Sequence, residues 1–174
     1  MAIGGYDEER NALSSVEIVD PLNKTTSCQA VNDLPQPRYG YITNGKYICG
    51  GSDGASGLKS CIDNQFKPSP LTLPYKLDGA ASIVINDETW WITGGWNDDY
   101  ELTPKTLVLN PGEESFVGST NLPEAMDEHC IASINRTHLF IAGNFRGDRK
   151  SAYIVDVSTP SFKFSTRKNL NKRR

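Results

Sequence analysis

Four cysteines carry the most definite chemistry in this sequence of 174 residues. Cys49 and Cys61 fall in two predicted strands that would be antiparallel neighbours, which brings their Cα atoms within reach of a disulfide. Two buried free thiols, which behave as small hydrophobic groups, are the alternative. Cys28 and Cys130 lie in different repeats and are not paired by this argument. The spacings fit no zinc motif, because no second close cysteine pair is present and the chain has two histidines.

The sequence contains no recognisable catalytic set. His129 precedes Cys130, but adjacent residues of a strand point to opposite faces, so the two cannot act as a nucleophile and its base. We therefore expect His129 to have a structural role. Phosphate-binding loops, dinucleotide fingerprints and the G-x-S-x-G elbow are missing as well. These observations predict a protein that is not an enzyme and that needs no metal and no cofactor.

Three tryptophans cluster between residues 90 and 96. Trp90 and Trp91 are consecutive in a predicted strand, so we expect one to pack on each side of a sheet. Trp96 instead opens a loop that continues with Asp98, Asp99 and Tyr100. An aromatic ring among charged residues has the composition of a binding hot spot. An indole folded over the edge of the sheet is the alternative.

Two N-glycosylation motifs bear on the compartment. They begin at Asn23, in Asn23-Lys24-Thr25, and at Asn135, in Asn135-Arg136-Thr137. Together with the even number of cysteines, they favour a secreted glycoprotein, with the cytoplasm as the alternative. The opening MAIGGYDEER shows no signal peptide.

Charge is unevenly distributed along the chain. The net charge is −3, yet the last eight residues hold five basic side chains, which leaves 13 basic against 21 acidic residues in the rest. An acidic body argues against nucleic-acid binding, which needs a basic patch. No apolar run approaches the roughly 20 residues of a membrane-spanning helix.

A repeat organises the whole chain. An aliphatic strand followed by glycine recurs at Gly4, Gly50, Gly94 and Gly143, at intervals of about 45 residues. After each copy comes an extended run that ends in Asp or Asn; these runs are 15–20, 59–64, 105–110 and 151–156. A Leu-Pro pair closes three of the four periods. Alternating apolar residues and Asn-containing turns predict antiparallel strands and almost no helix. Four strands in each period are typical of a propeller blade.

The glycine pairs, the strand ending in Asp and the Leu-Pro linker resemble the kelch repeat. The cysteine next to Gly50-Gly51 is similar to that of kelch-like proteins of invertebrates, which are often secreted. The resemblance implies an all-β, kelch-type β-propeller segment over residues 1–170, followed by a basic tail at 171–174. Its blades would span about 1–35, 36–74, 75–123 and 124–170, with the first strand of the first blade missing. The sequence departs from the repeat, since the usual tryptophan is replaced by Phe66, Phe116 and Phe162.

Kelch propellers usually have six or seven blades, so three blades and most of a fourth imply part of a larger propeller. Exposed blade faces would favour self-association. The resemblance also implies protein binding through the loops after the glycine pairs and between blades, with a partner that the sequence does not identify. Candidate binding residues in these loops are Asp7, Glu8, Arg10, Trp96, Asp98, Asp99, Tyr100, Arg146, Asp148 and Arg149. Two alternatives remain open: a secreted carbohydrate-related protein like galactose oxidase, and the substrate receptor of a ubiquitin ligase.

Overall fold

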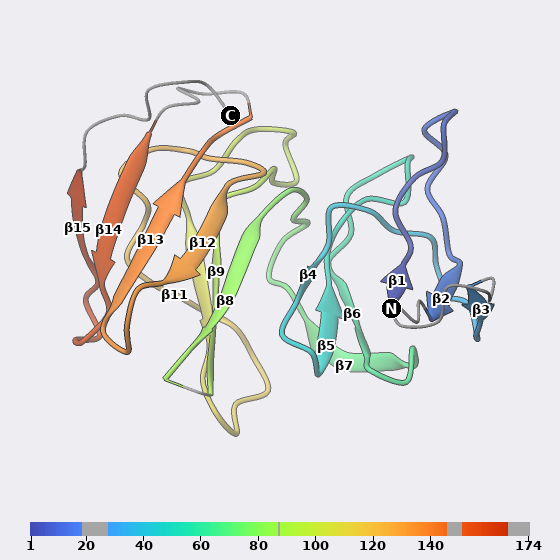
Figure 1. Cartoon of the computed structure of the whole chain (residues 1–174), viewed down its shortest axis with the longest axis horizontal. Coiled ribbons are helices and arrows are strands. Elements are labelled where there is room, and N and C mark those ends of the chain that lie inside the picture. Colours follow the sequence, from blue (N-terminus) through green and yellow to red (C-terminus); the bar gives the residue numbers. More distant parts are fainter. Residues whose placement is uncertain (19–27, 87, 146–150, 167–174) are drawn as a thin grey trace.

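A computed structural model describes residues 1–18, 28–86, 88–145 and 151–166 of the chain. Within these residues all regular structure is β, and the strands form four antiparallel sheets (Figure 1). The described part of the chain has no helix, and so none long and apolar enough to cross a membrane. The all-β prediction is therefore confirmed.

The sheets follow one another along the chain, and we number them I to IV. Sheet I has three strands: β1 (Ala2–Ile3), β2 (Val16–Ile18) and β3 (Gln29–Ala30). Sheet II has four: β4 (Ile42–Thr43), β5 (Tyr47–Cys49), β6 (Ser60–Asp63) and β7 (Pro68–Thr72). Sheet III comprises β8 (Ala81–Ile85), β9 (Thr89–Thr93), β10 (Thr106–Leu109) and β11 (Val117–Gly118). Sheet IV comprises β12 (Cys130–Ser133), β13 (His138–Ala142), β14 (Ala152–Asp156) and β15 (Lys163–Thr166).

Asparagine side chains close the turn between the first two strands of sheets II and IV. Asn44 Oδ1 accepts hydrogen bonds from the backbone N–H groups of Lys46 (3.0 Å) and Tyr47 (2.8 Å). Asn135 accepts in the same way from Thr137 and His138, both at 2.9 Å. These bonds replace ladder bonds that the backbone cannot make in a tight turn, which is why asparagine suits these positions.

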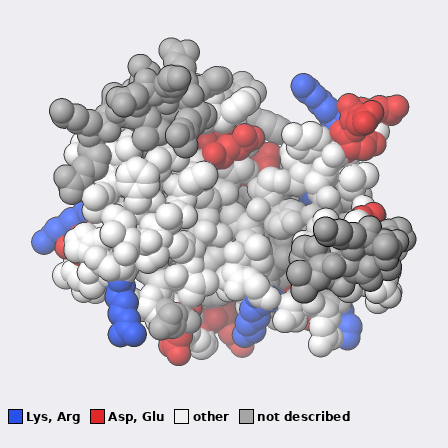
Figure 2. All heavy atoms as spheres, in the orientation of Figure 1, with Lys and Arg blue, Asp and Glu red and all other residues white. Residues whose placement is uncertain are grey.

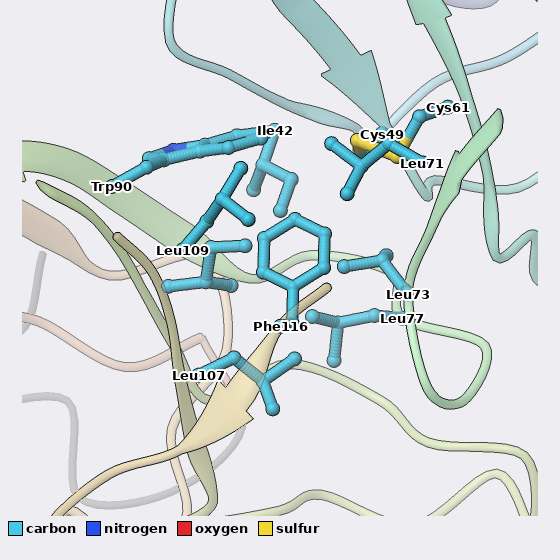
Figure 3. Close-up of a cluster of buried hydrophobic side chains, with 11 residues drawn as sticks. Ile42, Cys49, Cys61, Leu71, Leu73, Leu77, Trp90, Leu107, Leu109 and Phe116 are labelled. Carbon is cyan, nitrogen blue, oxygen red and sulfur yellow. A yellow bond between two sulfur atoms is a disulfide. The ribbon is translucent and has the colours of Figure 1, made fainter. Parts of the chain in front are cut away.

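Each pair of successive sheets shares one apolar cluster. Val16 and Ile48 belong to the cluster between sheets I and II. Trp90 packs with sheet II residues in the second cluster (Figure 3), and Trp91 packs with sheet IV residues in the third. The two consecutive tryptophans therefore face opposite sides of sheet III, as the alternation predicted. Phe66, Phe116 and Phe162 take part in the first, second and third clusters respectively.

The glycine pair of sheet II lies in close contact with the linkers before and after this sheet. A Cβ atom on Gly50 would collide with Leu77 O of the linker to sheet III, and one on Gly51 would collide with Tyr39 O. Both residues have positive φ, 67° and 84°. The Gly51 N–H also donates to Leu77 O at 2.8 Å. Glycine is required here because the turn and the close approach leave no room for a side chain.

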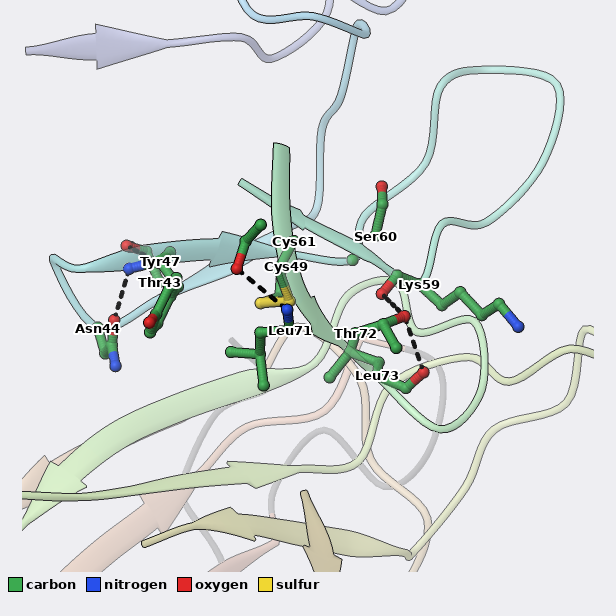
Figure 4. The surroundings of a disulfide bond; sticks show 12 residues. Thr43, Asn44, Tyr47, Cys49, Lys59, Ser60, Cys61, Leu71, Thr72 and Leu73 are labelled. Atoms are coloured by element: carbon green, nitrogen blue, oxygen red, sulfur yellow. Dashed lines mark hydrogen bonds between the residues drawn. A yellow bond between two sulfur atoms is a disulfide. The ribbon is translucent and has the colours of Figure 1, made fainter. Parts of the chain in front are cut away.

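Cys49 and Cys61 form a disulfide between β5 and β6, where they are directly opposite each other in the register (Figure 4). Both are buried in the cluster shared by sheets II and III, beside Leu71 and Leu73. The predicted pairing is confirmed. Cys28 and Cys130 are exposed free thiols.

Candidate binding pocket on the glycine-loop edge

The loops after the glycine pairs meet the linkers between sheets at one edge of the molecule. A pocket of about 420 Å³ opens there. Its lining comes from the glycine loops of sheets II to IV and from the linkers between them: Tyr39, Ser52, Gly54, Ala55, Ser56, Gly57, Lys76, Asp78, Trp96, Asn97, Asp98, Tyr100, Asp127, Glu128 and Phe145. Figure 2 shows acidic side chains at the upper edge of the molecule, between the sheets on its left and those on its right.

Trp96 is held in the pocket wall by its backbone and by its ring. Its N–H and C=O pair with Asp78 at 2.8 and 3.2 Å, which joins the loop to the linker before sheet III. The indole Nε1–H donates to Asp127 Oδ2 at 3.0 Å, which joins the same loop to the linker before sheet IV. The half-buried indole therefore lines the pocket in a fixed orientation, whereas the sequence had left open whether it was exposed or folded over the sheet edge.

Three carboxylates from the linkers share the pocket with the indole. Asp127 is 1% exposed, Asp78 is half-buried and Glu128 is exposed. Burial, with a smaller contribution from the charges of Glu128 and Asp127, raises the pKa of Asp78 to about 6, although a hydrogen bond from the Gly79 N–H acts to lower it. A positively charged ligand would stabilise the ionised form of this half-buried carboxylate and so lower its pKa again.

The outer wall of the pocket is a polar loop with an exposed aromatic ring. Asn97 Oδ1 accepts hydrogen bonds from the N–H groups of Asp99 (2.9 Å) and Glu101 (3.0 Å), which shapes the loop. Asp98 Oδ1 accepts from the Lys76 N–H at 3.1 Å and so ties the loop to the linker before sheet III. Tyr100 lines the pocket as well, with a φ of 56° and a side chain that is 68% exposed.

The structure separates the residues that the sequence had grouped together. Trp96, Asp98 and Tyr100 line the pocket, and Asp99 does not. Asp7, Glu8 and Arg10 lie in the glycine loop of sheet I and are not part of the lining. The Asp7 carboxylate is engaged within that loop, where it accepts from the Asn11 N–H at 2.8 Å. Arg146, Asp148 and Arg149 fall outside the described residues, as does the motif at Asn23.

Sequence reasoning missed the linker residues of the site. Tyr39, Asp78 and Asp127 occupy the same place in three successive repeats, just before the first strand of each sheet. The backbone of each hydrogen-bonds to the second residue after the first glycine of the same sheet; these partners are Ser52, Trp96 and Phe145. An alignment of the repeats would have shown one aromatic and two acidic residues at this position, which marks the linkers as part of the candidate site.

His129 has a structural environment. Its Nε2 lies 2.7 Å from Thr93 Oγ1 of sheet III, and the ring is buried. Burial lowers the pKa of His129 to about 4, and the charge of Asp127 opposes this shift in part. Within the described residues, no three His, Cys, Asp or Glu side chains are grouped as metal ligands would be.

Comparison with known proteins supports a similarity of fold. No protein-family model matches the sequence, and no curated protein matches it. Among solved structures, the chain is similar to that described as the structure of YjhT, with a TM-score of 0.73 and 12% sequence identity. The match covers 98% of this chain and 65% of YjhT, so the chain spans less than two thirds of that protein's length.

Proposed function

We propose that the chain is a segment of a kelch-type β-propeller that binds a protein partner without catalysis. Four successive antiparallel sheets that pack against one another through shared apolar clusters support the propeller architecture. The binding role rests on one observation: the pocket where loops and linkers of sheets II to IV meet. Loops held on a rigid β scaffold are common places for recognition.

The pocket favours a positively charged side chain of the partner. Among the described lining residues, Asp78, Asp98, Asp127 and Glu128 are acidic and Lys76 is basic. Trp96 and Tyr100 add aromatic surfaces, on which a guanidinium or ammonium group stacks favourably. An arginine or lysine that enters from a protein segment would meet both kinds of contact. We therefore propose a basic segment of a protein as the ligand.

Titration with matched peptides tests this function. Two short peptides that differ in one central residue, Arg or Glu, are added to isotopically labelled protein. We expect the Arg peptide to shift the Trp96 indole N–H resonance, because that group lies in the pocket wall. Asp78→Asn should weaken the binding several-fold, whereas Glu17→Gln, which removes an exposed carboxylate of sheet I, should leave it unchanged. Equal responses to both peptides would refute a charge-selective site.

Carbohydrate is the second ligand class that this lining suits, because sugars stack on indole rings and hydrogen-bond to carboxylates. A set of neutral oligosaccharides in the same titration separates the two functions. If oligosaccharides shift the Trp96 resonance and the Arg peptide does not, the carbohydrate-binding alternative replaces the protein-binding proposal.

A further inference from the structure

The turn between β12 and β13 holds the glycosylation motif that the structure describes. Asn135, Arg136 and Thr137 are all exposed in this turn. We propose that Asn135 carries an N-linked glycan, attached at the edge of the molecule opposite the binding pocket. The proposal does not depend on the function proposed above.

The local geometry leaves the amide nitrogen of Asn135 available. Its Oδ1 accepts hydrogen bonds from the Thr137 N–H (2.9 Å), the Thr137 Oγ1–H (3.1 Å) and the His138 N–H (2.9 Å). Its Nδ2 makes no hydrogen bond to any residue in the described ranges, and the residue as a whole is exposed. The threonine of the motif is thus hydrogen-bonded to the amide whose nitrogen would be modified.

The modification is a transfer from a lipid-diphosphate-linked oligosaccharide. Asn135 Nδ2 attacks the anomeric carbon C1 of the first sugar, so an N–C1 bond forms and the bond between C1 and the phosphate oxygen breaks. The lipid diphosphate leaves with that electron pair, and Nδ2 loses one proton to a base of the transferase. No oxidant or reductant is consumed.

The disulfide supports the compartment that this transfer needs. Cys49 and Cys61 are paired and buried between two sheets, which is typical of folding in an oxidising compartment. In eukaryotic cells, that compartment is also where N-linked oligosaccharides are attached to Asn-X-Ser/Thr motifs. The two features, on different sheets, point to the same folding environment.

The surface around Asn135 has room for sugars and exposed apolar groups for them to cover. A groove of about 500 Å³ runs beside the turn and is lined in part by Val84, Asn135, Arg136 and Leu139. Val84 is 38% exposed and Ile134 is 53% exposed. In Figure 1 the turn between β12 and β13 lies at the lower edge, whereas the glycine loops lie at the upper edge. A glycan here would cover apolar surface and leave the binding pocket open.

Asn44 provides a matched control. It occupies the equivalent turn of sheet II and caps the backbone in the same way, but Lys46 stands where the motif requires threonine. Replacing Asn44 by Gln disturbs the same kind of turn without removing a motif.

To test this, the full chain is fused to a signal peptide and secreted from eukaryotic cells. It carries the substitution Asn23→Gln, so that the motif at Asn135 is the one that remains. We expect one glycan by intact mass, and peptide N-glycosidase in heavy-oxygen water should convert Asn135 to labelled Asp. Asn135→Gln and Thr137→Ala should abolish the increase in mass that the glycan causes. Thr137→Ser and Asn44→Gln should keep it. Binding of the Arg peptide should be the same with and without the glycan.

An unmodified Asn135 in secreted, disulfide-bonded Asn23→Gln protein would overturn the proposal. Where a variant is not secreted, translation in the presence of microsomes gives the same readout before folding is complete. Loss of the increment there in Asn135→Gln but not in Asn44→Gln supports the assignment, and no increment in the parent chain refutes it.

Discussion

Asp78 and His129 have pKa values shifted in opposite directions, and the two shifts act on stability in overlapping pH ranges. The pKa of Asp78 is raised from 3.8 to about 6, so the folded state holds its proton longer, and the free energy of unfolding falls as pH rises through that window. The pKa of His129 is lowered from 6.5 to about 4, so the unfolded state takes up the proton first, and the free energy of unfolding falls as pH falls through that window. Between about pH 4 and 6, the two slopes oppose each other.

Replacing Asp78 by Asn should therefore leave the pH dependence of the free energy of unfolding that His129 causes. We expect the free energy of unfolding of this variant to rise with pH by up to about 1.4 kcal/mol per pH unit between about pH 4 and 6.5. Above pH 6 the variant should also be more stable than the parent, because it no longer buries a charge close to two other carboxylates. Urea unfolding at several pH values measures both effects. His129→Gln is the control, with the opposite slope expected, and a profile of Asp78→Asn identical to that of the parent would contradict the prediction.

At the scale of elements, the disulfide joins two adjacent strands and closes a short loop. Cys49→Ala should lower the free energy of unfolding by about 2–3 kcal/mol, since the two cysteines are 12 positions apart in the sequence and the unfolded chain gains freedom without the link. Denaturant melts of oxidised protein would measure the loss.

Non-reducing peptide mapping should recover a peptide that joins Cys49 and Cys61, with Cys28 and Cys130 free. If both cysteines of the pair were recovered as thiols from secreted material, the assignment would be wrong.

The glycine turns of sheets II to IV lie between the second and third strands of each sheet, and two of them form a matched pair. Gly94 and Gly143 precede the glycine loops of sheets III and IV, with φ of 63° and 85°. A Cβ on Gly94 would collide with Met126 O of the next linker, whereas no described atom lies within 4 Å of one on Gly143. Alanine at either position should cost about 1 kcal/mol through its positive φ. Gly94→Ala should cost a further 1–3 kcal/mol, roughly, through the collision. Equal losses for the two variants in thermal or urea unfolding would show that close approach of the sheets is not the reason for the glycine.

At the scale of the whole molecule, the outer side of sheet IV resembles an interface between sheets. Leu139 and Val155 pack toward sheet III, so alternation turns their neighbours Phe140 and Ile154 to the other side, where they are half-buried cross-strand partners. Apolar faces of this kind are normally covered by another sheet in repeat proteins. We expect the chain alone to associate at micromolar concentration in light scattering.

Phe140→Ser combined with Ile154→Ser should reduce that association. Val117→Ser is the control, because Val117 is an exposed apolar residue on the outermost strand of sheet III and not on this face. A monomer with a cooperative melt in the parent chain would show that four sheets suffice without further covering.

The sequence determined those features that depend on local backbone geometry. Period-two alternation placed Trp90 and Trp91 on opposite sides of a strand. The predicted antiparallel pairing of neighbouring strands brought Cys49 and Cys61 within reach of a disulfide, and the register of the structure sets them directly opposite each other. The repeated glycines marked the turns because glycine alone tolerates positive φ beside a neighbouring carbonyl. The tertiary structure alone decided the pocket. Asp78, Asp127 and Trp96 come from different linkers and loops, and their contact depends on how far and at what angle successive sheets pack, which side-chain volumes in the interfaces set.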